Sequence, residues 1–113
     1  MATSQRLKTL TTLYYVLILG GEKMEIDNKL SSIIGVIETV SEDTTLPRNI
    51  RRALTESVEH LKSDEENLVK VGAAVYVIES LTEDINMPPH ARTQIWNILT
   101  ALESILKELR ESS

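Results

Sequence analysis

VIETVSEDTTLPRNIRRALTESVEHL, residues 36–61, decides the fold because residues 77–102 repeat it as VIESLTEDINMPPHARTQIWNILTAL. At a constant offset of 41 residues, with no gaps, eight of the 26 positions are identical, and most differing core-type positions exchange one aliphatic side chain for another. The chain therefore contains one structural unit twice. The identical pairs are Val36/Val77, Ile37/Ile78, Glu38/Glu79, Glu42/Glu83, Asp43/Asp84, Pro47/Pro88, Arg51/Arg92 and Leu61/Leu102.

Each unit has the pattern of two helices joined by a short polar turn. Apolar residues recur at three- and four-residue spacing on both sides of the turn, which is typical of amphipathic helices. Proline follows each turn, where it suits the first turn of a helix. A single hairpin of this kind cannot cover its own apolar face. The sequence therefore predicts an all-α protein, an up-and-down four-helix bundle made of two repeated helical hairpins. The first expected helix begins near residue 27 or 28 and extends to about residue 40, and the second begins at residue 46 or 47 and extends to about residue 61. The third and fourth span about residues 66–83 and 88–111.

Composition narrows the classes of function. A chain of 113 residues, 42% hydrophobic and 26% charged, is one ordinary globular domain. It has no cysteine, which excludes disulfides, thiolate nucleophiles and zinc or iron–sulfur sites built on cysteine. Neither a nucleophile–base pair nor a set of residues with metal-ligand spacing is visible. We therefore expect a protein that is not an enzyme and has no catalytic residue, metal or cofactor. The net charge of −5 argues weakly against general nucleic-acid binding.

The N-terminal residues 1–23 differ from the repeated body. Arg6 and Lys8 precede an apolar run over residues 13–19, which is too short to span a bilayer. Three interpretations stay open: an upstream extension of the reading frame before a start at Met24, an extra N-terminal amphipathic helix docked on the bundle, or a signal or anchor segment. We divide the chain into this extension and a four-helix bundle domain, residues 24–113, and expect no membrane partner.

Arginine and acidic residues recur together at the turn of each hairpin. A guanidinium group binds carboxylates through paired hydrogen bonds, which fixes the geometry better than a single exposed ion pair does. We therefore expect each arginine to bind the acidic residues of its own turn. The residues of this structural clasp are Glu42, Asp43 and Arg51 in the first hairpin and Glu83, Asp84 and Arg92 in the second.

Arg48 and Arg52 have no basic counterpart in the repeat, because Pro89 and Thr93 stand at the equivalent positions. Positive charge is unfavourable in the first turn of a helix, where the backbone already carries partial positive charge. Together with His90, these arginines are candidate contacts for a phosphate group or an acidic partner. A solvated basic face explains the two arginines equally well, and His90 alone is more typical of a polar surface or capping residue.

The last expected helix runs about two turns beyond its repeat partner. Its apolar residues there have heptad-like spacing, and the hairpin is too short to cover them. A homodimer would cover this seam, and docking of residues 7–19 is the competing explanation. Trp96, next to the core positions of this helix, is either a partly buried anchor or an interface residue. The candidate dimer seam consists of Ile98, Ile105, Leu106 and Leu109.

The stretches LPRNIRRA, residues 46–53, and NMPPHARTQIW, residues 86–96, resemble those of a small archaeal family of uncharacterised proteins. The resemblance extends over roughly residues 26–107 and leaves out residues 1–23. It implies a four-helix bundle, an archaeal source and a cytoplasmic location, and no activity.

Two functions follow as hypotheses. The first is a non-enzymatic helical protein–protein interaction module that forms a homodimer or binds an unidentified protein partner. The alternative is an accessory factor that associates with the ribosome, RNA or another ribonucleoprotein through Arg48 and Arg52.

Overall fold

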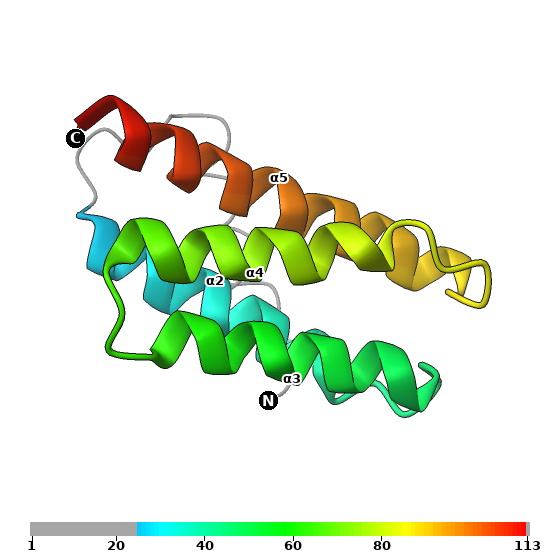
Figure 1. The fold of residues 1–113 in the computed structure, drawn as a ribbon. Helices are drawn as coiled ribbons and strands as arrows, with labels where there is room; N and C mark the ends of the chain where they lie inside the picture. The colour runs from blue at the N-terminus through cyan, green and yellow to red at the C-terminus, as the bar shows by residue number, and fades with distance from the viewer. Residues whose placement is uncertain (1–24, 113) are drawn as a thin grey trace.

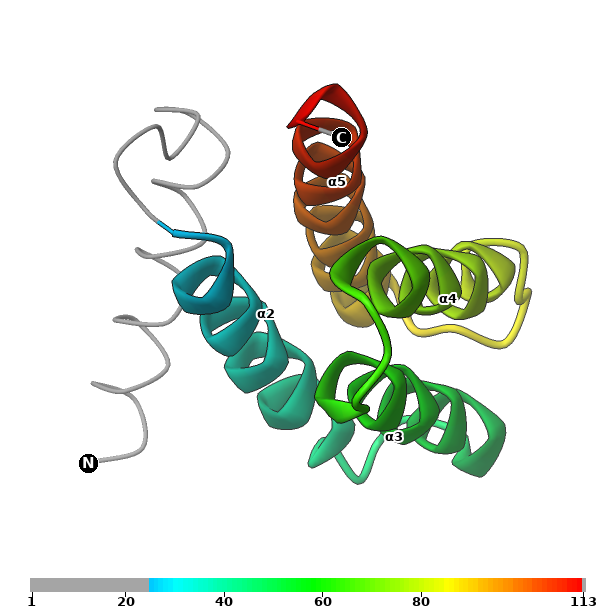
Figure 2. The same ribbon diagram turned by 60° about the vertical axis from the view of Figure 1, so that its left-hand side comes forward.

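The computed structural model describes residues 25–112, which form four helices joined by short turns (Figure 1). Each helix packs against the next, and the last also contacts the first, so that the four close into a bundle (Figure 2). The predicted all-α, up-and-down four-helix bundle is confirmed for this part of the chain, whereas the interpretations of residues 1–23 concern a segment outside it. The helices are α2 (Ile26–Ser41), α3 (Arg48–Lys62), α4 (Asn67–Leu81) and α5 (Pro89–Ser112).

The repeat in the sequence is also a repeat in burial. Eleven positions between residues 30 and 61 are buried, and every position 41 residues later is buried as well. The two hairpins, α2–α3 and α4–α5, therefore present the same apolar face to one shared core. The equivalent buried pairs are Leu30/Val71, Ile33/Ala74, Val36/Val77, Ile37/Ile78, Val40/Leu81, Leu46/Met87, Ile50/Ala91, Leu54/Ile95, Ser57/Ile98, Val58/Leu99 and Leu61/Leu102.

Two polar side chains lie within this core, and both have partners. The Ser57 hydroxyl donates to the Leu54 carbonyl oxygen at 2.7 Å. Lys29 forms an ion pair with Glu108, which joins the start of α2 to the last turns of α5. Burial of a polar group is unfavourable unless it is hydrogen-bonded, so these contacts allow the two residues to remain inside.

The chain has two glycines inside its described helices, Gly35 in α2 and Gly72 in α4. A close helix crossing is the usual reason for a glycine at such positions. However, a Cβ built on either residue would have no heavy atom within 4 Å of it apart from its own helix backbone and chain neighbours. Packing among residues 25–112 therefore gives no reason for either glycine.

No helix of the described residues is long and apolar enough to cross a membrane.

The space around these glycines predicts that Gly35→Ala and Gly72→Ala each stabilise the folded chain. Glycine costs about 1 kcal/mol relative to alanine inside a helix, and the added methyl group meets nothing. We expect each substitution to raise the free energy of unfolding by up to about 1 kcal/mol, measured by urea denaturation followed by circular dichroism. A loss of stability for either variant would show that another group occupies the space.

Candidate functional site

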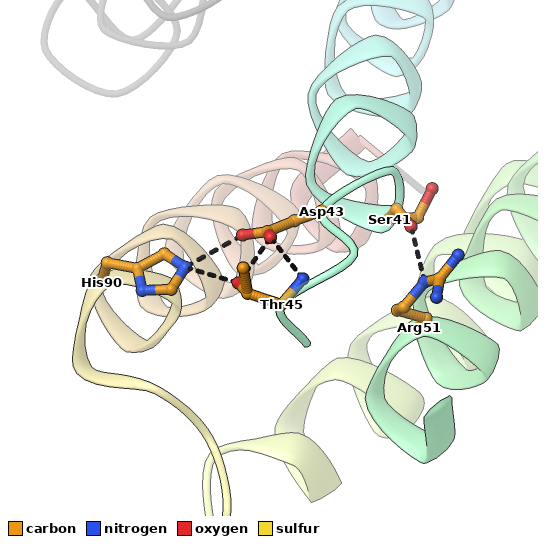
Figure 3. A network of polar contacts seen from close by, with 5 residues as sticks. All are labelled: Ser41, Asp43, Thr45, Arg51 and His90. Atoms are coloured by element: carbon orange, nitrogen blue, oxygen red, sulfur yellow. Dashed lines mark hydrogen bonds and ion pairs between the residues drawn. The ribbon is translucent and has the colours of Figure 1, made fainter. Parts of the chain in front are cut away.

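The two hairpin turns, residues 42–47 and 82–88, lie at the same end of the bundle (Figure 1). In each turn an arginine from the following helix donates hydrogen bonds to main-chain carbonyl oxygens at, or within three residues after, the end of the preceding helix. Arg51 Nε donates to the Ser41 carbonyl oxygen at 3.4 Å (Figure 3). Arg92 Nη1 donates to the Thr82 carbonyl oxygen at 3.2 Å, and its Nη2 donates to that of Asp84 at 3.3 Å.

These contacts correct the predicted clasp, in which the same arginines bind the carboxylates of the turns. The observed acceptors are main-chain carbonyl oxygens, and within residues 25–112 neither arginine forms an ion pair with an acidic residue of its turn. The last carbonyl groups of a helix lack intrahelical donors and carry partial negative charge, so they suit a cation. Of the predicted carboxylates, those of Glu42 and Glu83 belong to exposed residues.

The carboxylates of Asp43 and Asp84 instead link each turn to the other hairpin. Asp43 Oδ2 lies 2.9 Å from His90 Nε2, at the start of α5. Asp84 Oδ2 accepts a hydrogen bond from Asn49 Nδ2, at the start of α3, at 2.8 Å. His90 and Asn49 are themselves equivalent, 41 residues apart. The two links, here called the reciprocal turn contacts, are therefore one interaction made twice.

The other oxygen of each aspartate holds its own turn. Asp43 Oδ1 accepts the Thr45 main-chain N–H at 2.9 Å and also the Thr45 hydroxyl (Figure 3). Asp84 Oδ1 accepts the Asn86 main-chain N–H at 2.8 Å. An aspartate that bonds the backbone two residues ahead is a common way to fix a tight turn. Each aspartate thus shapes its own turn and ties that turn to the other hairpin.

The hydrogen bond from the Thr45 side chain, followed by that from His90, lowers the pKa of the Asp43 carboxyl to about 2. Donors that point at a carboxylate favour its charged form. The pKa of Asp43 is lower in the folded chain than in the unfolded one, where it is about 3.9. The contribution of Asp43 to stability is therefore fully present when the pH is above about 3.9. This contribution is lost as the pH falls toward 2.

We therefore predict that Asp43→Asn flattens the acid limb of the stability profile. The wild-type chain should lose stability between pH 4 and pH 2, and the variant should lose less over the same range because its amide does not titrate. Urea denaturation at pH 2, 3, 4 and 7 measures this difference. Glu42→Gln, the neighbouring exposed position, is the matched control and should keep the wild-type slope. Equal slopes for Asp43→Asn and the wild type would contradict the assignment.

The candidate phosphate contacts do not form one cluster through contacts between their side chains. Arg48 and Arg52 are exposed on α3, one helical turn apart. His90 is directed at the first turn, where its Nε2 lies 2.9 Å from Asp43 Oδ2 and 3.3 Å from the Thr45 hydroxyl oxygen (Figure 3). Among the described residues, the structure brings His90 together with Asp43 and Thr45 and shows no contact of His90 with either arginine. A role in phosphate binding stays a prediction.

The predicted dimer seam on α5 is not an exposed apolar stripe, and that prediction was wrong. Ile98, Ile105 and Leu106 are buried in the core, and Leu109 is partly buried against it. The stripe needs no second chain to remove it from water, because α5 turns it toward the same core as the rest of the hairpin.

The exposed large apolar side chains among the described residues lie elsewhere, and all belong to the second hairpin. Their positions in the first hairpin, 41 residues earlier, hold polar residues or glycine. We call these five residues the apolar outer face. They are Leu68 (40% exposed), Val69 (52%), Tyr76 (77%), Ile85 (90%) and Trp96 (49%), and their counterparts are Asp27, Asn28, Gly35, Thr44 and Thr55.

A groove of about 620 Å³ runs between α4 and α5 beside this face. Leu68 and Gly72 precede Val75 by two turns and one turn on α4, and Trp96 precedes Thr100 by one turn on α5, so the face and the groove adjoin. The groove is lined by Val75, Glu79, Thr100, Glu103, Ser104, Leu106, Lys107 and Arg110. It therefore combines an apolar floor with acidic and basic side chains. Within the described residues, no group of three or more acidic, histidine or cysteine side chains is placed to hold a metal ion.

Sequence reasoning missed the reciprocal turn contacts and the apolar outer face. The first had a signal, because Asp43 and Asp84 are identical in the repeat and both Asn49 and His90 are polar. The apolar outer face could have been found at the positions where a large apolar residue in the second hairpin replaces a polar residue or glycine of the first. Trp96 was left open between core and interface, and the structure places it half exposed.

The chain is similar to known proteins in sequence. Residues 19–105 match the sequence pattern of the uncharacterised protein family UPF0147. A relative from Pyrococcus furiosus, UPF0147 protein PF0239, is 45% identical over 82 residues, which are 71% of this chain and 88% of that protein. A UPF0147 protein from Methanothermobacter thermautotrophicus is 42% identical over 89 residues, covering 76% of this chain and 84% of the relative.

Two solved structures are also similar. The crystal structure of MMP1188, a protein of unknown function, matches with a TM-score of 0.68 and 39% identity over 74% of this chain and 96% of that one. A crystal structure of a UPF0147 protein from Thermoplasma acidophilum matches with a TM-score of 0.66 over 70% of this chain and 94% of that one. Its identity of 24% supports a likeness in fold alone.

Proposed function

The chain belongs to the uncharacterised UPF0147 family, and we propose that it acts as a non-enzymatic helical module that binds another protein through the apolar outer face of its second hairpin. The observation that carries this proposal is the contrast between the two hairpins. Their buried positions match pair by pair, whereas their exposed apolar residues occur in one hairpin only.

The contrast matters because the first hairpin serves as an internal control. It folds with polar residues or glycine at the five positions where the second hairpin has Leu68, Val69, Tyr76, Ile85 and Trp96. The bundle therefore does not require large apolar side chains there. Exposed apolar groups that the fold does not require are typical of interaction sites, and tryptophan and tyrosine are enriched among the residues that dominate binding.

The second turn carries one of these residues on a main chain that is held by hydrogen bonds. Ile85 is 90% exposed. The turn that carries it is held by Arg92, by Asn49 and by the Asp84 side chain. A turn whose main chain is ordered before binding loses less conformational entropy when a partner covers it. Thr44 occupies the equivalent place in the first turn, so the same backbone arrangement does not by itself require an apolar residue.

A second candidate function is association with RNA or a ribonucleoprotein. It is favoured by the exposed positions of Arg48 and Arg52 on α3, for which no hydrogen bond or ion pair to another described residue is found. Contacts with phosphate weaken steeply as salt rises, because binding releases counterions. Apolar packing does not weaken in this way. Salt dependence of any association therefore separates the two functions.

We predict that the proteins that this chain binds in a lysate bind it through the apolar outer face. The test compares three tagged forms of the chain in lysate from an archaeon that encodes a relative. They are the wild type, Leu68→Glu with Tyr76→Glu, and Thr55→Glu with Thr39→Glu, which adds the same two charges to the first hairpin as a control. Quantitative mass spectrometry should show proteins that are retained by the wild type and the control and lost by the first variant. Because single surface substitutions change stability by only about 0.5 kcal/mol, both variants should keep the helical circular dichroism spectrum. If every retained protein binds all three forms equally, the proposed function fails.

A further inference from the structure

We propose that the partner bound at the apolar outer face contributes a helix, which lies along the groove between α4 and α5 and places a lysine against Glu79 and Glu103. This inference rests on the proposed function and names the kind of segment that binds there. Two features of the described residues support it. One is a pair of carboxylates that stands where the first hairpin has an ion pair, and the other is the apolar residues on both sides of that pair.

The first hairpin has an ion pair at the equivalent place. Lys62 Nζ, at the end of α3, donates to Glu38 Oε2 of α2 at 3.2 Å, and the two side chains form an exposed ion pair that joins the two helices. The residues 41 positions later are Glu103 and Glu79. Glu79 keeps the carboxylate of Glu38, whereas Glu103 has a second carboxylate in place of the ammonium group. The ion pair of the first hairpin thus becomes a pair of like charges in the second.

Glu79 and Glu103 lie at about the same level of the groove between α4 and α5. Both line it, together with Val75 and Leu106. The two helices run in opposite directions (Figure 1). One turn after Val75 on α4 and about one turn before Leu106 on α5 are therefore equal steps toward the second turn. In the described part of the chain neither carboxylate forms an ion pair, and Lys107, one turn beyond Glu103, forms none with them.

A pair of carboxylates at one level of a groove favours a cation. The two charges repel each other, and a positive charge placed between them relieves the repulsion. The first hairpin supplies that charge itself, as Lys62. Among the described residues of the second hairpin, none forms the corresponding ion pair. A partner that brings a lysine to this place restores the interaction that the fold already makes once.

Exposed apolar side chains lie on both sides of the acidic pair along the groove. Trp96 lies seven residues before Glu103 on α5, and Leu68 lies eleven residues before Glu79 on α4. Spacings of seven and eleven residues keep helical residues on one side of the helix. Because α4 and α5 are antiparallel (Figure 1), Trp96 and Leu68 lie in opposite directions from the acidic pair. They are about 27 Å apart along the helix axes, the length of about five turns of helix.

A helix fits this arrangement because the apolar residues and the charges follow one straight groove. An amphipathic helix that lies in a groove binds through a row of residues on one of its sides. The four-carbon stem of a lysine packs against the apolar floor of the groove, while its ammonium group reaches the carboxylates. The partner segment should therefore have a lysine with a large apolar residue about seven positions to one side and about eleven to the other, to match Trp96 and Leu68. Complementary charges of this kind select the partner and fix its register.

The first test locates the lysine. The tagged full chain of 113 residues is mixed with the same archaeal lysate and treated with a carbodiimide, which joins carboxylates to adjacent lysine amines. Mass spectrometry then identifies the peptides cross-linked between two different proteins. We expect Glu79 or Glu103 to be joined to a lysine of a retained protein, in a segment that has the apolar spacing given above.

The second test gives the second hairpin the ion pair of the first. Glu103→Lys places an ammonium group opposite Glu79, so the variant should be at least as stable as the wild type in urea denaturation. It should lower the retention of the cross-linked protein by about tenfold or more, since two lysines then face each other. Glu59→Lys, the same substitution at an exposed position of the first hairpin, is the matched control and should leave retention unchanged.

Two results would each overturn the proposed lysine contact. In one, the proteins that depend on Leu68 and Tyr76 show no cross-link from a lysine to Glu79 or Glu103. In the other, they bind Glu103→Lys as well as the wild type, or better, as an acidic or phosphate-bearing partner would. The proposed function stands in both cases, because these proteins still need the apolar outer face. If no retained protein depends on Leu68 and Tyr76, both proposals fail.

Discussion

The structure depends on the mutual burial of two apolar faces that neither hairpin can cover alone. Eleven equivalent positions are buried in both hairpins, and full burial of one large aliphatic side chain contributes about 1.5–3 kcal/mol. No surface contact in the bundle approaches the sum of these contributions. Because both hairpins must bury the same face, the residues at these positions are apolar in both hairpins, apart from Ser57. Its hydroxyl is satisfied by the backbone of its own helix.

Outside the core this constraint is absent, and there the two hairpins differ. At the turn end the two hairpins make equivalent polar contacts, with Asp43 bound to His90 and Asp84 bound to Asn49. These contacts fix how the hairpins meet without adding apolar burial. On the outer surface the symmetry is broken, since the exposed apolar residues belong to α4, α5 and the turn between them. Because the fold does not require this difference, the exposed apolar residues of the second hairpin are available for a function.

The fold could be predicted because its signals are local and periodic: helical spacing, proline after each turn, and a repeat that doubles each observation. The observed helices begin and end within about two residues of their expected bounds. The site was harder, because its contacts join residues far apart in sequence; Asp43 and His90 are 47 residues apart. Spacing predicts which residues share a helix face but not which neighbour covers that face. This is why Ile105 and Leu106 were assigned to an exposed seam, although both are buried.

The most direct test of the central claim gives the second hairpin the polar residues of the first. A chain with Leu68→Asp, Val69→Asn, Ile85→Thr and Trp96→Thr is compared with Ile78→Ala by urea denaturation at a concentration where both are monomeric. The mutual-burial account predicts that the four surface substitutions together cost less than about 2 kcal/mol, with cooperative unfolding kept, whereas the single core substitution costs about 2–5 kcal/mol. A four-substitution chain that unfolds more easily than Ile78→Ala would show that the outer face holds the bundle together.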